Sequence, residues 1–196
     1  MEDRVRVKEV KVLSDDWYIL KKTIFDFRRR DGSWQTLSRE TYDRGNGVTI
    51  LLFNRERKTV LLTRQFRFPA FVNGCRSGML IETCAGLLEN EEAEAAIRRE
   101  SEEETGYHLG PVTKLFEAYM SPGSVTEKLH FFVAEYDASS KKAEGGGDAN
   151  HGEEIEVLEL PLDDALTMIE IGEIQDGKTI MLLQYAKLKG RNGSLR

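Results

Sequence analysis

The chain has 196 residues, of which 40% are hydrophobic and 32% are charged, and its formal net charge is −6. This length and composition indicate one compact globular domain, or one domain with a small appendage, and a pI near 5.3 argues against general nucleic-acid binding. The chain has no apolar run long enough to span a membrane and no signal-peptide pattern at its start, so we expect a cytoplasmic protein without a membrane partner.

Strands dominate the first half of the predicted secondary structure. Val5, Val7, Val10 and Val12 predict an opening strand, and the turn residues at 31–32 predict a hairpin. The expected strands cover residues 5–12, 17–27, 34–42, 48–53, 59–64 and 79–85. The glycines at 44–47 mark a boundary, so we expect an N-terminal β region at 1–43 and a main domain at 44–196.

A helix is expected over about 90–105, followed by further strands and helices. Asn90 is a good N-cap, Glu91 and Glu92 suit the first turn, and Gly106 suits the C-terminal cap. Strands are expected near 112–119, 128–136 and 154–160, and helices near 162–171 and 177–188. The polar, glycine-rich loop at 137–153 is predicted to be mobile. This pattern favours an α/β fold with helices on the faces of a mixed sheet.

The predicted acidic helix concentrates negative charge. Residues 89–104 contain eight Glu and two Arg, a net charge of −6, so the rest of the chain is balanced. The apolar stripe of the helix ends in Glu100 and Glu104, where like charges four residues apart cost about 0.2–0.5 kcal/mol even when exposed. Either this is a solvated acidic face, or a cation lies between the carboxylates. Mg²⁺ takes one or two carboxylates together with substrate phosphates and water, which suits this pair.

The same segment carries a specific motif. The run at 99–107 resembles the core of the Nudix box, G-x5-E-x7-R-E-U-x-E-E-x-G-U, where U is an aliphatic residue. The spacer that begins at Gly86 is one residue shorter than in the pattern, and Ser101 replaces an aliphatic residue. Alignment from the helix makes Glu91 the isolated glutamate of the box, whereas alignment from the glycine makes it Glu92.

The resemblance extends along nearly the full chain to the Nudix hydrolases that act on nucleoside diphosphate sugars. The segments that carry it are 42–47, 64–67, 82–86, 119–123, 153–156 and 172–178. It is strongest for the members that hydrolyse GDP-mannose to GMP and mannose 1-phosphate. The resemblance implies a Nudix-type α/β/α sandwich, preceded by a small antiparallel β region that pairs two subunits and contributes to substrate recognition. It also implies Mg²⁺ as the cofactor, with Mn²⁺ as the alternative.

The resemblance also implies roles for individual residues. Arg99 would orient the box carboxylates, and Glu103 or Glu153 would be the general base. The implied metal ligands are the backbone carbonyl of Ala85 and the carboxylates of Glu100, Glu104 and Glu153. The positions implied to contact the nucleotide sugar are Trp17, Ser38, Arg39, Glu40, Arg67, Ala85, Gly86, Leu87, Glu104, Glu127, Gly152, Glu153 and Lys178.

Several of these residues also have an ordinary structural interpretation. Arg67 could bind phosphate through its guanidinium group, but taken alone it suits an exposed strand. Trp17 could stack on a guanine base or pack in a core or an interface, and Glu153 could be a loop residue without a role. Cys75 and Cys84 lack the spacing of metal ligands and are expected to be reduced thiols.

Three functions are compatible with these observations. Hydrolysis of GDP-mannose is the first, and hydrolysis of ADP-ribose or another nucleoside diphosphate sugar is the second, because both would use the same metal ligands. A non-catalytic nucleotide-binding Nudix domain is the third. The complete set of Arg99, Glu100, Glu103 and Glu104 argues against it, since a binding module does not need a costly carboxylate cluster.

Overall fold

The computed structural model describes residues 4–147, 152 and 154–190. Its internal contacts divide the chain into two compact units. The first unit consists of residues 1–46 and 119–128, and the second consists of 47–118 and 129–196.

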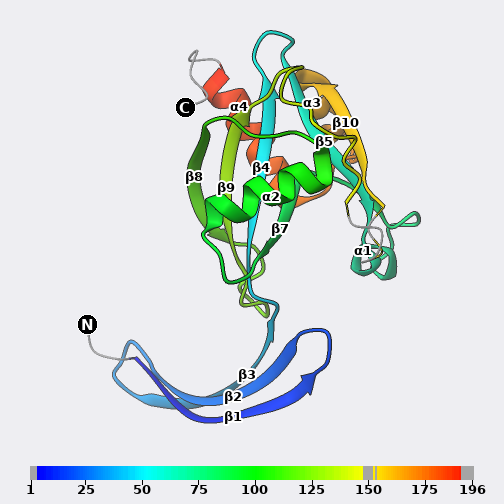
Figure 1. Ribbon diagram of the computed structural model, residues 1–196. Coiled ribbons are helices and arrows are strands. Elements are labelled where there is room, and N and C mark those ends of the chain that lie inside the picture. Colours follow the sequence, from blue (N-terminus) through cyan, green and yellow to red (C-terminus); the bar gives the residue numbers. More distant parts are fainter. Residues whose placement is uncertain (1–3, 148–151, 153, 191–196) are drawn as a thin grey trace. The chain divides into compact units, whose positions relative to one another are not determined.

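The first unit is built on a three-stranded antiparallel sheet of β1 (Val5–Asp15), β2 (Ile19–Arg28) and β3 (Trp34–Asp43), in that order (Figure 1). The turn between β2 and β3 forms as the sequence predicts. Gly32 has a φ of +84°, and the Asp31 carboxylate accepts a 2.9 Å hydrogen bond from the backbone N–H of Ser33. Such local bonds are the reason that Asp-Gly pairs favour turns.

Residues 119–128 belong to this unit although they are remote in sequence. The N–H of Tyr42 donates to the carbonyl of Ser124 at 2.8 Å, and the N–H of Thr126 donates to the carbonyl of Tyr42 at 3.1 Å. Tyr42 and Val125 form an isolated β-bridge. No local sequence pattern indicates a pairing between segments so far apart.

The second unit contains the mixed sheet that the sequence predicts. Its central path runs in the order β10-β5-β4-β9-β8, with β6 paired to β5 and β7 paired to β4. The strands are β4 (Asn46–Asn54), β5 (Thr59–Phe66), β6 (Met79–Glu82), β7 (Cys84–Leu88), β8 (Val112–Tyr119), β9 (Lys128–Glu135) and β10 (Glu156–Pro161). The β4–β9 pair is parallel, whereas β5 runs antiparallel to β4, β6 and β10.

Helices cover both faces of this sheet. In Figure 1, α2 (Ala93–Thr105) crosses the near face, and α4 (Gly177–Gly190) lies behind the strands. The helix α3 (Leu162–Glu170) contacts α4 and β10, and the short α1 (Phe68–Val72) contacts β6. This arrangement confirms the predicted α/β/α sandwich. Within the described part of the chain, no helix has the length and apolar character needed to cross a membrane.

The strand β4 has helices on both sides, and every residue from 47 to 54 is buried. On one face Val48, Ile50 and Leu52 join a core cluster that includes Ile97 of α2. Because side chains alternate along a strand, Thr49 points to the opposite face, toward α4. One strand therefore supports both the acidic helix and a buried polar region beneath α4.

Two expected elements have different boundaries in the structure. The helix α2 begins at Ala93 with Glu92 as its N-cap, so the prediction of Asn90 as the cap was wrong. Glu91 lies before the helix, and its carboxylate is 2.8 Å from the guanidinium group of Arg99. The single strand expected at 79–85 is interrupted at Thr83, whose N–H donates to the hydroxyl of Thr179 at 2.7 Å instead of to a strand.

The helix α1 was not predicted. It has five residues, too few to show a helical period, and Pro69 occupies its first turn. Cys75 and Cys84 are both free, as expected.

Candidate active site

Two carboxylates of α2 lie against the backbone of β7. Glu104 is 4% exposed, and the N–H of Ala85 donates to its Oε2 at 3.3 Å. The side chain of Glu100 covers the Cα of Gly86, since a β-carbon added there would lie 2.0 Å from its Cδ. Four residues that the resemblance assigned to one site therefore meet at one place.

The electrostatics of this pair favour a bound cation. Burial and the neighbouring charge of Glu100 raise the pKa of Glu104 to about 8, although hydrogen bonds from Cys84 and the N–H of Ala85 oppose the shift. A buried carboxyl group with this pKa is mostly protonated at neutral pH, and a cation would stabilise the ionised form.

The oxygen donors at this place suit a hard divalent ion such as Mg²⁺. Within residues 4–147, 152 and 154–190, no three acidic, histidine or cysteine side chains form a metal-binding group. The two α2 carboxylates would therefore need the carbonyl of Ala85 and a further ligand. Glu153, assigned to that role by resemblance, lies outside the described residues.

Arg99 connects the carboxylates around the helix. Its guanidinium group lies 2.8 Å from Glu91, 3.0 Å from Glu100 and 3.1 Å from Glu103. The hydrogen bond to Glu91 and the surrounding negative charges raise the pKa of Arg99, so it stays charged. Of the two candidates for the isolated glutamate of the box, Glu91 makes this contact, whereas Glu92 is the exposed N-cap of α2.

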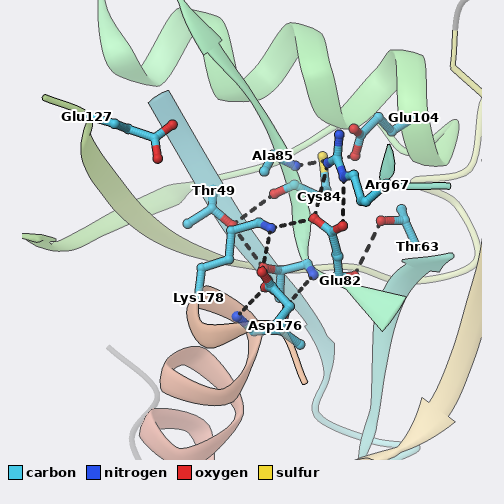
Figure 2. A network of polar contacts seen from close by, with 12 residues as sticks. Thr49, Thr63, Arg67, Glu82, Cys84, Ala85, Glu104, Glu127, Asp176 and Lys178 are labelled. Carbon is cyan, nitrogen blue, oxygen red and sulfur yellow. Dashed lines mark hydrogen bonds and ion pairs between the residues drawn. The ribbon is translucent and has the colours of Figure 1, made fainter. Parts of the chain in front are cut away.

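A second charged cluster centres on Glu82, the last residue of β6, which is 2% exposed (Figure 2). Arg67 donates from Nε to Oε1 at 2.7 Å and from Nη2 to Oε2 at 3.1 Å. The Nζ of Lys178 donates to the same Oε2, and lies 3.1 Å from Oδ1 of Asp176. Burial alone would raise the pKa of Glu82, but Lys178 and Arg67 lower it to about 2.

The charged residues of this cluster come from separate parts of the chain. Arg67 is the residue between β5 and α1, and Lys178 is in the first turn of α4. Asp176 precedes α4, and its Oδ2 accepts hydrogen bonds from the N–H and the hydroxyl of Thr179 at 3.0 and 2.7 Å. These bonds have the geometry of an N-cap, which fixes the direction in which α4 begins.

The remaining candidate residues are distributed over both units. Five of them belong to the first unit: Trp17, Ser38, Arg39, Glu40 and Glu127. Trp17 is 81% exposed in the turn between β1 and β2, and the three β3 residues are also exposed. The carboxylate of Glu127 lies 3.5 Å from Arg44. In the second unit, Leu87 follows Gly86 in β7, and Gly152 is exposed with a φ of +76°.

The first half of the loop at 137–153 is hydrogen-bonded to the end of α2, a contact that the sequence did not indicate. The N–H groups of Gly146 and Gly147 donate to the carbonyls of Glu104 and Glu103, at 2.9 and 3.1 Å. The N–H of Lys142 donates to the carbonyl of Gly106 at 2.8 Å. These bonds satisfy carbonyls at the end of α2 that would otherwise lack partners, which explains why a polar segment is held there.

Glu82 and Asp176 were not among the predicted site residues. Both lie in segments that carry the resemblance, 82–86 and 172–178, but the resemblance assigned neither residue a role. Taken alone, Glu82 is an acidic residue that ends the apolar run at 79–81, and such a residue usually marks the end of a strand. Its ion pairs join residues from 67 to 178, so only the folded chain reveals them.

Comparison with known proteins agrees with this geometry. Residues 4–42 match the model of the GDP-mannose pyrophosphatase NudK N-terminal domain, and residues 43–183 match that of the NUDIX domain. The GDP-mannose pyrophosphatase of Pectobacterium atrosepticum is 56% identical over 190 residues, covering 97% of each chain. That of Citrobacter koseri is 57% identical over 185 residues, covering 94% of this chain and 96% of its own.

A solved structure supports the fold. The crystal structure of an ADP compounds hydrolase superposes with a TM-score of 0.72 and covers 98% of both chains, at 18% sequence identity. At that identity the likeness concerns the fold alone. The match over 43–183 and the carboxylates of α2 on the backbone of β7 lead to one assignment: the chain belongs to the Nudix family.

Proposed function

We propose that this protein hydrolyses GDP-mannose to GMP and mannose 1-phosphate with Mg²⁺ as the cofactor and Mn²⁺ as the alternative. Curated relatives with that activity in their names are more than half identical to this chain over nearly its whole length. The single observation that carries the proposal is the pair of buried Glu104 and partly buried Glu100 against Ala85 and Gly86. A carboxylate pair of this kind is expensive in a protein that only binds nucleotides.

The reaction needs an attack by water on a phosphorus atom that is surrounded by negative oxygens. The P–O bond to the bridging oxygen breaks, and the water contributes the new oxygen on one phosphate. When bound, Mg²⁺ would neutralise phosphate charge and polarise a phosphoryl oxygen. The carbonyl of Ala85 and the carboxylates of Glu100, Glu104 and Glu153 would hold the ion.

The proton of the attacking water requires a base. Glu153 is our first candidate for this role, and Glu103 is the second. The Glu103 carboxylate lies 3.1 Å from Nη1 of Arg99, so it would have to leave or share that contact to accept a proton. Arg99 also lies 3.0 Å from Glu100, and we assign it the orientation of the box carboxylates.

We assign Arg67 and Lys178 to the phosphates of the substrate. The hydrogen bonds of Arg67 to Glu82 use Nε and Nη2, which leaves the outer Nη1 edge for a phosphate oxygen. Gly86, Leu87 and Gly152 are the further proposed contacts in the second unit.

We assign recognition of the base and sugar to residues of the first unit, Trp17, Ser38, Arg39, Glu40 and Glu127. We also propose a homodimer that uses this unit, because its outer strand β1 is exposed along its whole length. Val5, Val7, Val10 and Val12 on that strand are 49–62% exposed, and apolar rows of this kind usually have a partner. The cytoplasmic location expected from the sequence stays a prediction.

A panel assay tests the proposed activity. The purified protein with Mg²⁺ is given GDP-mannose, ADP-ribose and other nucleoside diphosphate sugars, and the products are identified by chromatography. The expected result is GMP and mannose 1-phosphate with the highest kcat/KM for GDP-mannose. Preference for ADP-ribose would move the assignment to the second function, and binding without turnover would support the non-catalytic alternative.

A further inference from the structure

Glu82 joins two cations that are remote from each other in the sequence. We propose that Glu82 is a positioning residue for substrate binding, which holds Arg67 and Lys178 as one rigid cation pair facing the phosphates of a nucleoside diphosphate. This inference rests on the proposed function, because it assigns those two side chains to the substrate. It concerns a residue that touches the cations and is not itself placed on the substrate.

The contact geometry restricts the guanidinium group of Arg67. Two parallel hydrogen bonds of 2.7 and 3.1 Å fix both the position and the plane of the group. Arg67 is 39% exposed in its side chain, whereas Glu82 is 2% exposed. A buried carboxylate therefore holds one edge of the guanidinium group of a partly exposed side chain, and these two bonds do not use Nη1.

Lys178 occupies a position where a cation is unfavourable without partners. It is in the first turn of α4, where the helix dipole repels positive charge, and its side chain is only 11% exposed. The carboxylates of Glu82 and Asp176 compensate both costs, since Nζ contacts each of them. Without Glu82, the positive charges of Arg67 and Lys178 would oppose each other across a buried space.

The backbone that carries this carboxylate is fixed from two sides. Glu82 is paired with Thr63 in the register of β5 and β6, and the hydroxyl of Thr63 donates to its carbonyl at 3.3 Å. The next residue, Thr83, is bonded through its N–H to Thr179 of α4 at 2.7 Å. Figure 2 shows Arg67 and Lys178 converging on the Glu82 carboxylate, with Asp176 beside Lys178.

The charge balance of this cluster favours a role in orienting the donor groups of Arg67 and Lys178. Arg67 and Lys178 are balanced by Glu82 and Asp176, so the cluster adds little net attraction for an anion. Buried ion clusters also rarely stabilise a fold more than apolar residues of the same volume. A site that fixes the direction of its donors before the substrate arrives avoids the entropy cost of ordering them. Replacing Glu82 is therefore expected to change KM more than kcat.

A double-mutant cycle on the full-length protein tests this inference. The variants are Glu82→Gln, Arg67→Gln and the double variant, with GDP-mannose as substrate. Removing Glu82 alone should raise KM by at least about tenfold, the size of one lost charge-assisted contact, with a smaller change in kcat. Adding Glu82→Gln to Arg67→Gln should raise KM further by much less, because part of the effect is transmitted through the same guanidinium group.

Two further measurements separate positioning from general destabilisation. Tyr136→Phe is the matched control, because it removes a buried hydroxyl bonded to Thr59 at 2.7 Å, at the opposite end of β5. It should lower Tm without raising KM. Glu82→Asp keeps the charge and should recover part of the lost affinity, and it replaces Glu82→Gln if that variant does not fold.

The inference is overturned if Glu82→Gln and Glu82→Asp both keep the wild-type KM, if the two effects on KM in the cycle are additive, or if Tyr136→Phe raises KM equally. These outcomes are distinct from failure of the proposed function, in which the wild-type protein itself hydrolyses no nucleoside diphosphate sugar. In that case calorimetry with GDP as the probe reports on Glu82, and equal binding by the wild type and Glu82→Gln rejects the positioning role.

Discussion

The side chain of Glu100 rests directly on the α-carbon of Gly86, so that a β-carbon at residue 86 would lie 2.0 Å from Cδ and 2.2 Å from Oε1 of the glutamate. The glycine that opens the box and the first carboxylate of the proposed metal site are thus in direct contact, with no space between them for a methyl group. The absence of a side chain at residue 86 allows the carboxylate to reach the backbone of β7.

Gly86→Ala should therefore impair metal binding more than folding. The flexible end of Glu100 can move away from the new methyl group, so Tm should change little, whereas the Mg²⁺ concentration needed for half-maximal activity should rise at least about tenfold. Gly110→Ala is the control, because a β-carbon there meets nothing within 4 Å. Unchanged Mg²⁺ dependence in Gly86→Ala would contradict the proposed metal site.

Replacing Glu100 or Glu104 should lower activity without lowering stability. Glu100→Gln or Glu104→Gln removes a ligand charge, and hydrolysis should fall by at least roughly a hundredfold. The Tm of the metal-free protein should hold or rise slightly, because a neutral Gln avoids the cost of burial and neighbouring negative charge that raises the pKa of Glu104. Turnover assays at saturating Mg²⁺ check this, and near-normal rates in both variants would rule out the metal assignment.

The raised pKa of Glu104 predicts a pH dependence in the metal-free protein. Its pKa is about 8 in the folded chain and has an ordinary value of 4.5. The stability it contributes is complete below pH 4.5 and is lost as the pH rises through about 8. The Tm of the metal-free wild type should therefore fall relative to that of Glu104→Gln between these limits, as thermal melts across the range would show.

Metal binding should release a proton over the same range. An ionised Glu104 is the form that holds a cation, so Mg²⁺ affinity should increase as the pH rises toward 8. Titration calorimetry in buffers of different ionisation enthalpy measures this release. A wild-type proton release no larger than that of Glu104→Gln would show that Glu104 is already ionised without metal.

The anchored half of the glycine-rich loop should be protected from hydrogen exchange without any ligand. The amides of Lys142, Ala143, Gly146 and Gly147 all donate to carbonyls of residues 103–106, so they should exchange slowly in the metal-free protein. The amide of Gly110 provides a comparison from another loop. Fast exchange at all four positions would instead support the prediction of a loop that is mobile from residue 137 onward.

The apolar row on β1 should mediate dimer formation. Val10→Asp places a charge on this row and should convert a dimer to a monomer, with a rise in KM for the nucleotide sugar, because the proposed recognition residues lie in the same unit. Lys11→Asp introduces the same side chain on the opposite face of the strand and should leave the dimer intact. Light scattering combined with kinetics measures both effects. A wild-type monomer, or a Val10→Asp dimer with unchanged KM, would exclude this arrangement.

Most of the elements could be predicted from sequence because their signals are local. The apolar stripe that ends in Glu100 and Glu104 repeats at the period of a helix, and the valines of β1 alternate as in a strand on either side of an irregularity between Val7 and Glu9. The Asp31-Gly32 pair is a turn signal by itself. The box motif is also local, because a helix alone places residues 99, 100, 103 and 104 at a fixed spacing. The order of residues along one segment is therefore enough to indicate the family.

Tertiary structure decided the features that depend on contacts between distant segments. The break at Thr83 exists because a hydroxyl on α4 captures its N–H, and residues 119–128 join the first unit because they pair with Tyr42. Glu82 became prominent only when the fold brought Arg67 and Lys178 to the same carboxylate. The sequence by itself determined which side chains are candidates for the chemistry, because spacing along one helix is a short-range property. Which carboxylates are buried, shifted in pKa or paired with a cation was decided by packing, since desolvation and Coulomb energies depend on neighbours that no local pattern names.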